Sequence, residues 1–273
     1  MKGSNSDSSG RPEDRVKYIA LPVVPTFLRR LWQKTRARLP GQGIVAPALP
    51  GEGEFRLRTL ALTEAFPGIA SKHVSLDVGQ LERDDEWLLP LRELFTLAAI
   101  CQHIRPMRVF EFGTYLGVST SVIADNTPPT TEIFTLDLDP ATRAQHHHGL
   151  GVGGFPNFVP GSCFLGRLAE AKIHQLLGDS LTFDPSPFRA SMDLVFIDSD
   201  HTYKFVKSDS DNAFEMLRPG GVILWDDYRW QPAHPECAGV TRVLDELANT
   251  RECFALARTR FAAYRDDLKF EKG

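Results

Sequence analysis

The stretch Val109-Phe110-Glu111-Phe112-Gly113-Thr114-Tyr115-Leu116-Gly117-Val118-Ser119-Thr120-Ser121 decides the fold class. Its apolar beginning predicts a buried strand over 107–112, and the residues from Val118 onward predict a helix over 118–125. Between them, Gly113 and Gly117 allow a loop that brings backbone N–H groups close to a ligand. The spacing G-x-x-x-G differs from the dinucleotide pattern G-x-G-x-x-G, and a tight turn without a ligand also explains the two glycines taken alone.

The same alternation of strand and helix continues on the C-terminal side of this stretch. Short apolar runs predict further strands, and the segments between them predict helices; the strands cover 132–137, 172–177, 193–198 and 221–226, and the helices cover 203–217 and 239–248. This alternation predicts an α/β fold with a doubly wound, mostly parallel sheet. Two β-like runs, RECFALA and RFAAYRD, predict a hairpin at the edge of that sheet.

A long helix is expected before the first strand. It follows Asp84 and Asp85, and it places one set of apolar residues on one face; these are Leu88, Leu91, Leu94, Phe95 and Ala98. With this helix the predicted globular domain covers residues 85–273.

The N-terminal part of the chain has a different composition. Residues 1–15 are rich in Ser, Gly, Asp and Asn and are expected to be a disordered tail. The extension 16–84 contains a basic amphipathic helix over 25–40 and a Pro/Gly-rich linker. The helix suits peripheral docking on an anionic membrane, although packing on the domain or on a second subunit of a homo-oligomer is favoured.

Composition excludes several classes of protein. The 273 residues are 42% hydrophobic and 24% charged, which is typical of a soluble globular protein. No apolar run reaches the length of a transmembrane segment, and the net charge of −4 argues against a dedicated nucleic-acid binder. The four cysteines form no CxxC pair and the N-terminus has no apolar signal segment, so we expect reduced thiols and a cytoplasmic location.

Acidic residues follow the second and third predicted strands. Asp137 ends its strand, where a carboxylate can accept both hydroxyls of a ribose, whereas Asp139 before Pro140 is expected to cap the next helix. Asp179 and Ser180 follow the third strand, where they reach an adenine edge or simply form a turn. These positions predict a nucleotide-containing cofactor.

A second group of acids follows the next two strands. Asp198 leaves the strand 193–198, and Asp226 and Asp227 leave the strand 221–226. If these strands are neighbours, the three carboxylates converge and repel one another unless a cation lies between them. Oxygen ligands suit Mg²⁺ or another hard divalent ion, although solvated acids at strand ends remain the alternative.

Together the motifs resemble the class I S-adenosylmethionine-dependent methyltransferases, especially the small bacterial group that includes macrocin-type sugar O-methyltransferases. The segments EFGTYLGVSTSVIA, TLDLDP, LLGDSLTFDPSPF, MDLVFIDSDHTYKFVKSD, LRPGGVILWDDY and TRFAAYRD carry the resemblance. It implies a seven-stranded sheet with one antiparallel strand from the final hairpin. It also resembles catechol O-methyltransferase in placing one Asp after the fourth strand and an acidic pair after the fifth.

The resemblance also implies roles for individual residues. It assigns a divalent ion to Asp198, Asp226 and Asp227, and S-adenosylmethionine to Glu111, Gly113, Asp137, Asp179 and Ser180, with Tyr115, Ser119 and Ser121 beside the methionine part. Gly117 in the loop and Asp198 complete the predicted cofactor-binding set.

The predicted reaction is methyl transfer to a hydroxyl of a small molecule such as a sugar or a catechol. A base must remove the hydroxyl proton, and the candidates are Asp200, slightly favoured because it follows Asp198 by two residues, and His201. A Rossmann-type oxidoreductase and a non-catalytic cofactor-binding protein are the alternatives. The histidines His146, His147 and His148 are interpreted as a polar helix end, and GLGVGG at 149–154 as a loop or lid.

Overall fold

The structure is a computed structural model that describes residues 56–77, 79, 87–142, 158–228 and 237–268. These residues lie in one compact unit, 48–273, whereas the unit 1–47, with the predicted basic helix and tail, lies outside the described residues. Within the described part, no helix has the length and apolar character needed to cross a membrane.

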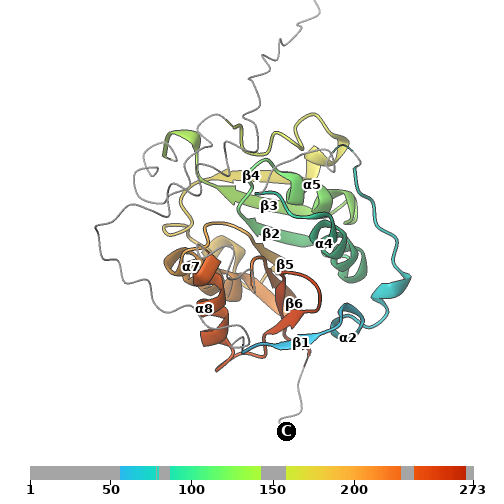
Figure 1. Cartoon of the computed structure of the whole chain (residues 1–273). Helices are drawn as coiled ribbons and strands as arrows, with labels where there is room; N and C mark the ends of the chain where they lie inside the picture. The colour runs from blue at the N-terminus through green and yellow to red at the C-terminus, as the bar shows by residue number, and fades with distance from the viewer. Residues whose placement is uncertain (1–55, 78, 80–86, 143–157, 229–236, 269–273) are drawn as a thin grey trace, which may run out of the picture. The chain divides into compact units, whose positions relative to one another are not determined.

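The described residues form an α/β fold around one eight-stranded sheet, in the order β1-β7-β8-β6-β5-β2-β3-β4 (Figure 1). All neighbouring strands run parallel except for the pairs that involve β8. The strands are β1 (Arg58–Leu60), β2 (Arg108–Phe112), β3 (Glu132–Asp137), β4 (Ile173–Leu177), β5 (Met192–Ile197), β6 (Leu217–Trp225), β7 (Phe254–Leu256) and β8 (Ala262–Arg265). The predicted doubly wound, mostly parallel sheet is confirmed.

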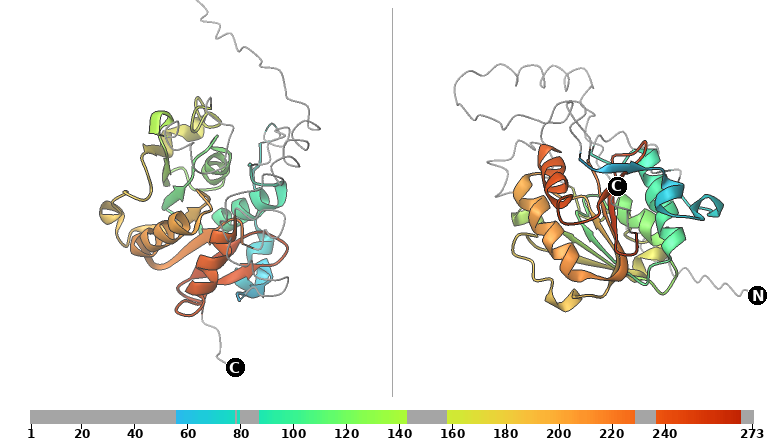
Figure 2. Two further views of the ribbon diagram at one scale, coloured as in Figure 1. Left: turned by 60° about the vertical axis from the view of Figure 1, so that its left-hand side comes forward. Right: turned by 90° about the horizontal axis from the view of Figure 1, so that it is seen from below.

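Helices cover both faces of this sheet (Figure 2). The α-helices are α2 (Leu62–Ala65), α4 (Leu91–Ile104), α5 (Val118–Asp125), α7 (Tyr203–Met216) and α8 (Ala238–Leu247), and the short 3₁₀ helices are η1 (Ile69–Ser71), η2 (Leu168–Lys172) and η3 (Ser186–Phe188). Helices α4 and α5 pack with Val109 of β2 on one face, and α7 and α8 pack with Phe110 on the other. Because successive strand residues point to opposite faces, the apolar runs of the central strands supply both cores.

The predicted helix face of α4 is partly wrong. Leu94 and Ala98 are buried, but Leu91 and Phe95 are 53% and 49% exposed. The helix begins at Leu91, after Pro90 as the N-cap. A proline disfavours helical conformation in the residue before it, here Leu89, so the helix does not extend back to Leu88.

The sheet is longer than the sequence indicates. The predicted hairpin forms as β7 and β8, but β7 is not at the edge, because β1 pairs with it in parallel. The chain segment before residue 85 therefore contributes an eighth strand. Strand β6 also begins at Leu217, four residues before the predicted start, through an irregular register against Met192 of β5.

Strand order reverses between β2 and β5. From β2 the chain continues through β3 and β4 in one direction, and then returns to β5 and β6 on the other side of β2. In open α/β sheets, ligands bind outside the carboxyl ends of the strands at such a switch point. The carboxyl ends of β2 and β5 carry Gly113 and Asp198, which makes this edge the place to look for a site.

Candidate active site

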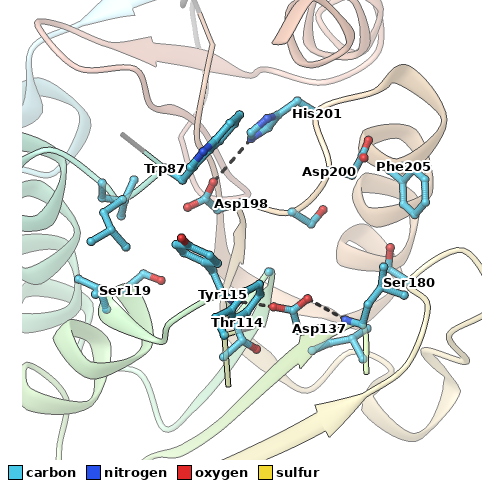
Figure 3. A pocket seen from close by; sticks show the side chains of 18 of the residues that line it. Trp87, Thr114, Tyr115, Ser119, Asp137, Ser180, Asp198, Asp200, His201 and Phe205 are labelled. Carbon is cyan, nitrogen blue, oxygen red and sulfur yellow. Dashed lines mark hydrogen bonds and ion pairs between the residues drawn. The ribbon is translucent and has the colours of Figure 1, made fainter. Parts of the chain in front are cut away.

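A cavity of about 270 Å³ opens at the carboxyl ends of β2, β3 and β5 (Figure 3). Its lining combines apolar walls with a few polar groups, as is usual for small-molecule sites. The lining includes nine predicted site residues or their neighbours: Gly113, Tyr115, Ser119, Asp137, Gly178, Ser180, Asp198, Asp200 and His201. Trp87, Leu88, Leu138, Phe158 and Phe205 supply the apolar walls.

Gly113 lies directly after β2, against the backbone that leaves β5. Its φ is +95°, and a Cβ built on it would lie 1.9 Å from the backbone oxygen of Asp198. The two strands are joined here because the Asp198 N–H donates to Phe112 O at 2.9 Å. The glycine is therefore needed for strand packing as well as for access to the cavity.

Asp137 ends β3 and reaches into the cavity as predicted. Its Oδ2 accepts a hydrogen bond from the Tyr115 N–H at 2.6 Å, and its Oδ1 accepts one from the Leu138 N–H at 2.7 Å. These bonds fix the carboxylate at the strand end, where a ribose would be recognised in this class of sheet. Asp139 instead accepts from the N–H groups of Ala141 and Thr142, in the capping role predicted for it.

Four predicted cofactor residues do not line the cavity. Ser121 Oγ donates to Gly117 O within helix α5, and Gly117 itself packs against Phe164. Asp179 accepts from the Leu181 N–H in a turn. Glu111 is completely buried beneath the loop, where its Oε2 accepts from Thr120 Oγ1 at 2.5 Å and from Thr135 Oγ1 at 2.6 Å.

Burial raises the pKa of Glu111 from its ordinary 4.5 to about 7, although the hydrogen bonds from Thr120, Thr135 and Ser119 oppose the shift. Below pH 4.5 the side chain is protonated in both the folded and the unfolded chain. Between pH 4.5 and 7 only the unfolded chain loses the proton, so the free energy of unfolding falls as pH rises through this window.

Glu111→Gln should remove that pH dependence. The glutamine carbonyl can still accept from both threonines, but it cannot ionise. Relative to this variant, the wild type should lose on the order of 3 kcal/mol of stability between about pH 4.5 and 7. Urea unfolding of both proteins at the two ends of this range measures this loss. If the difference in stability between wild type and variant is the same at both pH values, the raised pKa of Glu111 is contradicted.

The three predicted metal ligands come together at the ends of β5 and β6. One carboxylate oxygen from each of Asp198, Asp226 and Asp227 lies within 4.8 Å of the others. Asp198 lines the cavity, whereas Asp226 and Asp227 are 3% and 1% exposed and lie behind it. Burial raises the pKa of Asp226 well above its usual range, as do the charges of Asp227 and Asp198, while Arg260 opposes the shift.

His201 connects this acid cluster (Asp198, Asp226 and Asp227) to the cavity. Its Nε2 lies 2.8 Å from Asp227 Oδ2 and 3.9 Å from Asp198 Oδ1, and the imidazole is 19% exposed. Burial opposes protonation, but hydrogen bonding to Asp198, Asp227 and Cys237 raises the pKa of His201 well above 6.5. Figure 3 shows the ring beside Trp87 and above Asp198.

Asp200, the other base candidate, also lines the cavity. Its Oδ1 accepts from the Thr202 N–H at 2.8 Å, at the start of α7. One oxygen of Asp200 therefore binds the backbone just before α7, whereas His201 has a buried carboxylate partner.

Arg260 is a site residue that the sequence analysis missed. It follows Thr259 in the turn between β7 and β8, and its guanidinium binds the acid cluster: Nη2 donates to Asp226 Oδ2 at 2.5 Å and Nε donates to Asp226 Oδ1 at 3.2 Å. The Nε also lies 3.4 Å from Asp227 Oδ1. The antiparallel register that pairs Trp225 with Ala262 could have indicated this, because it places Arg260 beside the end of β6.

A divalent ion fits this arrangement poorly. The donor set of three carboxylates has the right chemistry for Mg²⁺. However, both oxygens of Asp226 already bind the Arg260 guanidinium, and Asp227 contacts both Arg260 and His201. The side chains in place thus disagree with a metal centre that uses all three acids.

Some predicted features lie outside the described residues. They include the helix 25–40, the three histidines 146–148 and the glycine-rich stretch 149–154.

Comparison with known proteins shows what part of the chain is similar to. Residues 110–228 match the family described as "Methyltransferase domain". Catechol O-methyltransferase B of Danio rerio is 24% identical over 180 residues, which cover 63% of this chain and 60% of that protein. Caffeoyl-CoA O-methyltransferase of Stellaria longipes is 24% identical over 134 residues, which cover 49% of this chain and 51% of that protein. The alignments thus span less than two thirds of either relative's length.

Solved structures are similar at lower identity. The O-methyltransferase TomG of Streptomyces achromogenes, in complex with SAM, is 18% identical, with a TM-score of 0.49 over 74% of this chain and 96% of that one. An O-methyltransferase of Bacillus cereus, in complex with SAH, is 15% identical, with a TM-score of 0.47 over 66% of this chain and 84% of that one.

The family match runs from Phe110 in β2 to Tyr228 just after β6 and includes the strand ends that border the cavity, but not Trp87 and Leu88 of its apolar wall. The match of residues 110–228 to a methyltransferase domain confirms the resemblance to S-adenosylmethionine-dependent methyltransferases seen in the motifs.

Proposed function

We propose that this chain transfers the methyl group of S-adenosylmethionine to a hydroxyl oxygen of a small-molecule acceptor. The observation that carries the proposal is one cavity that has Asp137 on one side and, on the other, His201, whose imidazole is paired with the buried Asp227. Asp137 is placed to bind the ribose of a nucleoside, and His201 is placed to remove a proton.

The cofactor would lie along the ends of β2 and β3. Asp137 would accept the ribose hydroxyls, Ser180 with Leu138 would border the adenine, and Ser119 with Tyr115 would border the methionine part. When bound, the cofactor supplies a methyl group already activated by its positive sulfonium. The negative Asp198 on the adjacent wall suits that positive charge.

The acceptor would lie beside His201. Trp87, Leu88 and Phe205 provide apolar walls that exclude water and hold the hydroxyl in line with the methyl group. The neutral imidazole of His201 takes the hydroxyl proton as the oxygen bonds to the methyl carbon and the carbon–sulfur bond breaks. Asp227, at 2.8 Å, orients the imidazole and stabilises the imidazolium that forms.

The divalent ion expected from the sequence forms no part of this proposal, and no step depends on it. The positive charge beside the acids comes instead from Arg260.

Asp137→Ala should weaken binding of S-adenosylhomocysteine by about 1–3 kcal/mol, the range for losing charge-assisted hydrogen bonds. Calorimetric titration of the folded variant measures the loss, and titration of the wild type with NAD separates this function from that of an oxidoreductase. Asp139→Ala is the matched control, since Asp139 caps Ala141 and Thr142 and does not line the cavity. Equal affinity in the Asp137 variant and the wild type would contradict the assignment of Asp137.

Turnover itself is tested by transfer of a labelled methyl group from S-adenosylmethionine to a panel of hydroxylated acceptors. Binding of S-adenosylhomocysteine together with transfer to an oxygen is the expected result. Failure to bind S-adenosylhomocysteine at all would overturn the proposed function.

A further inference from the structure

We infer that the Arg260 guanidinium is the resident cation of the acid cluster and takes the place that a divalent metal ion would occupy between Asp226 and Asp227. The inference concerns charge and contacts at the ends of β5, β6 and β8. It does not depend on whether the chain transfers a methyl group.

The first support is the geometry of the guanidinium. Two of its nitrogens meet the two oxygens of Asp226, and Nε also approaches Asp227 Oδ1. A guanidinium that donates two parallel hydrogen bonds matches the geometry of a carboxylate better than an ammonium group does. These bonds occupy the same carboxylate oxygens that a metal ion would need as ligands.

The second support is that the backbone of Arg260 is fixed on both sides. Its N–H donates to Oε1 of the buried Glu93 on α4 at 3.2 Å, and its carbonyl accepts from the Tyr228 N–H at 2.9 Å. Tyr228 follows Asp227 directly, so the arginine and the acids belong to one hydrogen-bonded unit. The Arg260 side chain is only 16% exposed, and those of Asp226 and Asp227 are 2% exposed. Arg260 is therefore held in place by the fold, and its guanidinium is a structural part of the acid cluster.

The third support is the balance of charge. Three carboxylates, those of Asp198, Asp226 and Asp227, face the guanidinium of Arg260 and the imidazole of His201. A bound divalent ion would have to displace the guanidinium from Asp226 and leave it buried beside a second cation, which is unfavourable. Given the proposed function, methyl transfer should therefore proceed in excess chelator, and the acceptor needs no adjacent pair of hydroxyls to chelate an ion.

Titration with Mn²⁺, followed by the electron paramagnetic resonance signal of the free ion, tests the inference without an acceptor or a cofactor. Tag-free wild type should bind no Mn²⁺ at the cluster up to millimolar concentration. Arg260→Ala should bind it at least about tenfold more tightly than wild type, because three carboxylates then lack their guanidinium partner. Adding Asp226→Asn to Arg260→Ala should remove the gain. The histidines 146–148 are common to all variants, so their contribution cancels.

Two results would overturn the inference. One is Mn²⁺ binding by the wild type that Asp226→Asn abolishes, since the ion and the guanidinium would then coexist at Asp226. The other is a folded Arg260→Ala variant with no gain in affinity. If Arg260→Ala does not fold, the comparison of wild type with Asp226→Asn decides alone: equal Mn²⁺ binding supports the inference, and lower binding by Asp226→Asn overturns it.

Discussion

Gly113→Ala should destabilise the folded domain by about 3 kcal/mol or more, which is a large effect for one methyl group. The new Cβ would lie 1.9 Å from the oxygen and 2.6 Å from the carbonyl carbon of Asp198, both backbone atoms. The hydrogen bond from the Asp198 N–H to Phe112 O prevents the strand ends from separating without further loss. Urea unfolding of the variant and the wild type measures the change.

Gly220→Ala is the matched control for this prediction. Gly220 has a similarly positive φ of +77°, but no heavy atom lies within 4 Å of the position of its added Cβ. The free energy of unfolding of Gly220→Ala should fall only by the cost of placing an alanine in left-handed backbone, about 1–2 kcal/mol. If Gly113→Ala and Gly220→Ala lose similar amounts of stability, the clash between the added Cβ and the Asp198 backbone is not important.

The sequence predicted the central sheet well because each inner strand is a short apolar run followed by a turn. The predicted ranges for β2, β3, β4 and β5 agree with the structure to within one residue. Asp137 and Asp198 were found for the same reason, since an acid directly after such a run lies at the carboxyl edge of the sheet. Helix α5 was predicted at its observed bounds, because Gly117 marks its start.

What the sequence did not predict depends on contacts between distant segments. Strand β1 has three residues, Arg-Thr-Leu, with two of them exposed, and so carries no apolar pattern. Glu111 was predicted to bind the cofactor, but its side chain accepts hydrogen bonds from two buried threonines. The alternating pattern of the strand does not distinguish these two roles.

Arg260 was missed for a related reason. In the run TRFAAYRD it reads as an exposed turn residue, and only the antiparallel pairing of β6 with β8 brings it to Asp226. The sequence therefore showed the carboxylates of the acid cluster but not the guanidinium of Arg260. Without that positive charge, a metal ion was the favoured partner for the acids.

His201→Gln should lower kcat about 10²- to 10⁴-fold, the usual contribution of a positioned general base, while affinity for S-adenosylhomocysteine stays nearly unchanged. Glutamine keeps a hydrogen bond to Asp227 but cannot take the hydroxyl proton. Methyl transfer to an acceptor from the panel gives kcat, and calorimetry gives cofactor affinity. A fall in kcat without a fall in affinity separates proton transfer from binding.

Two further variants decide which side chain is the base. His174→Gln, at an exposed position on β4 where the ring stacks on Phe134, controls for loss of a histidine and should leave kcat unchanged. Asp200→Asn tests the competing candidate: because one Asp200 oxygen is already held by the Thr202 N–H, this variant should lose less activity than His201→Gln. A larger loss in Asp200→Asn than in His201→Gln would assign the proton to Asp200 and reduce His201 to a charge partner of Asp227. The structure favours the first outcome, because of the two candidates His201 contacts a buried carboxylate that can stabilise the proton after transfer.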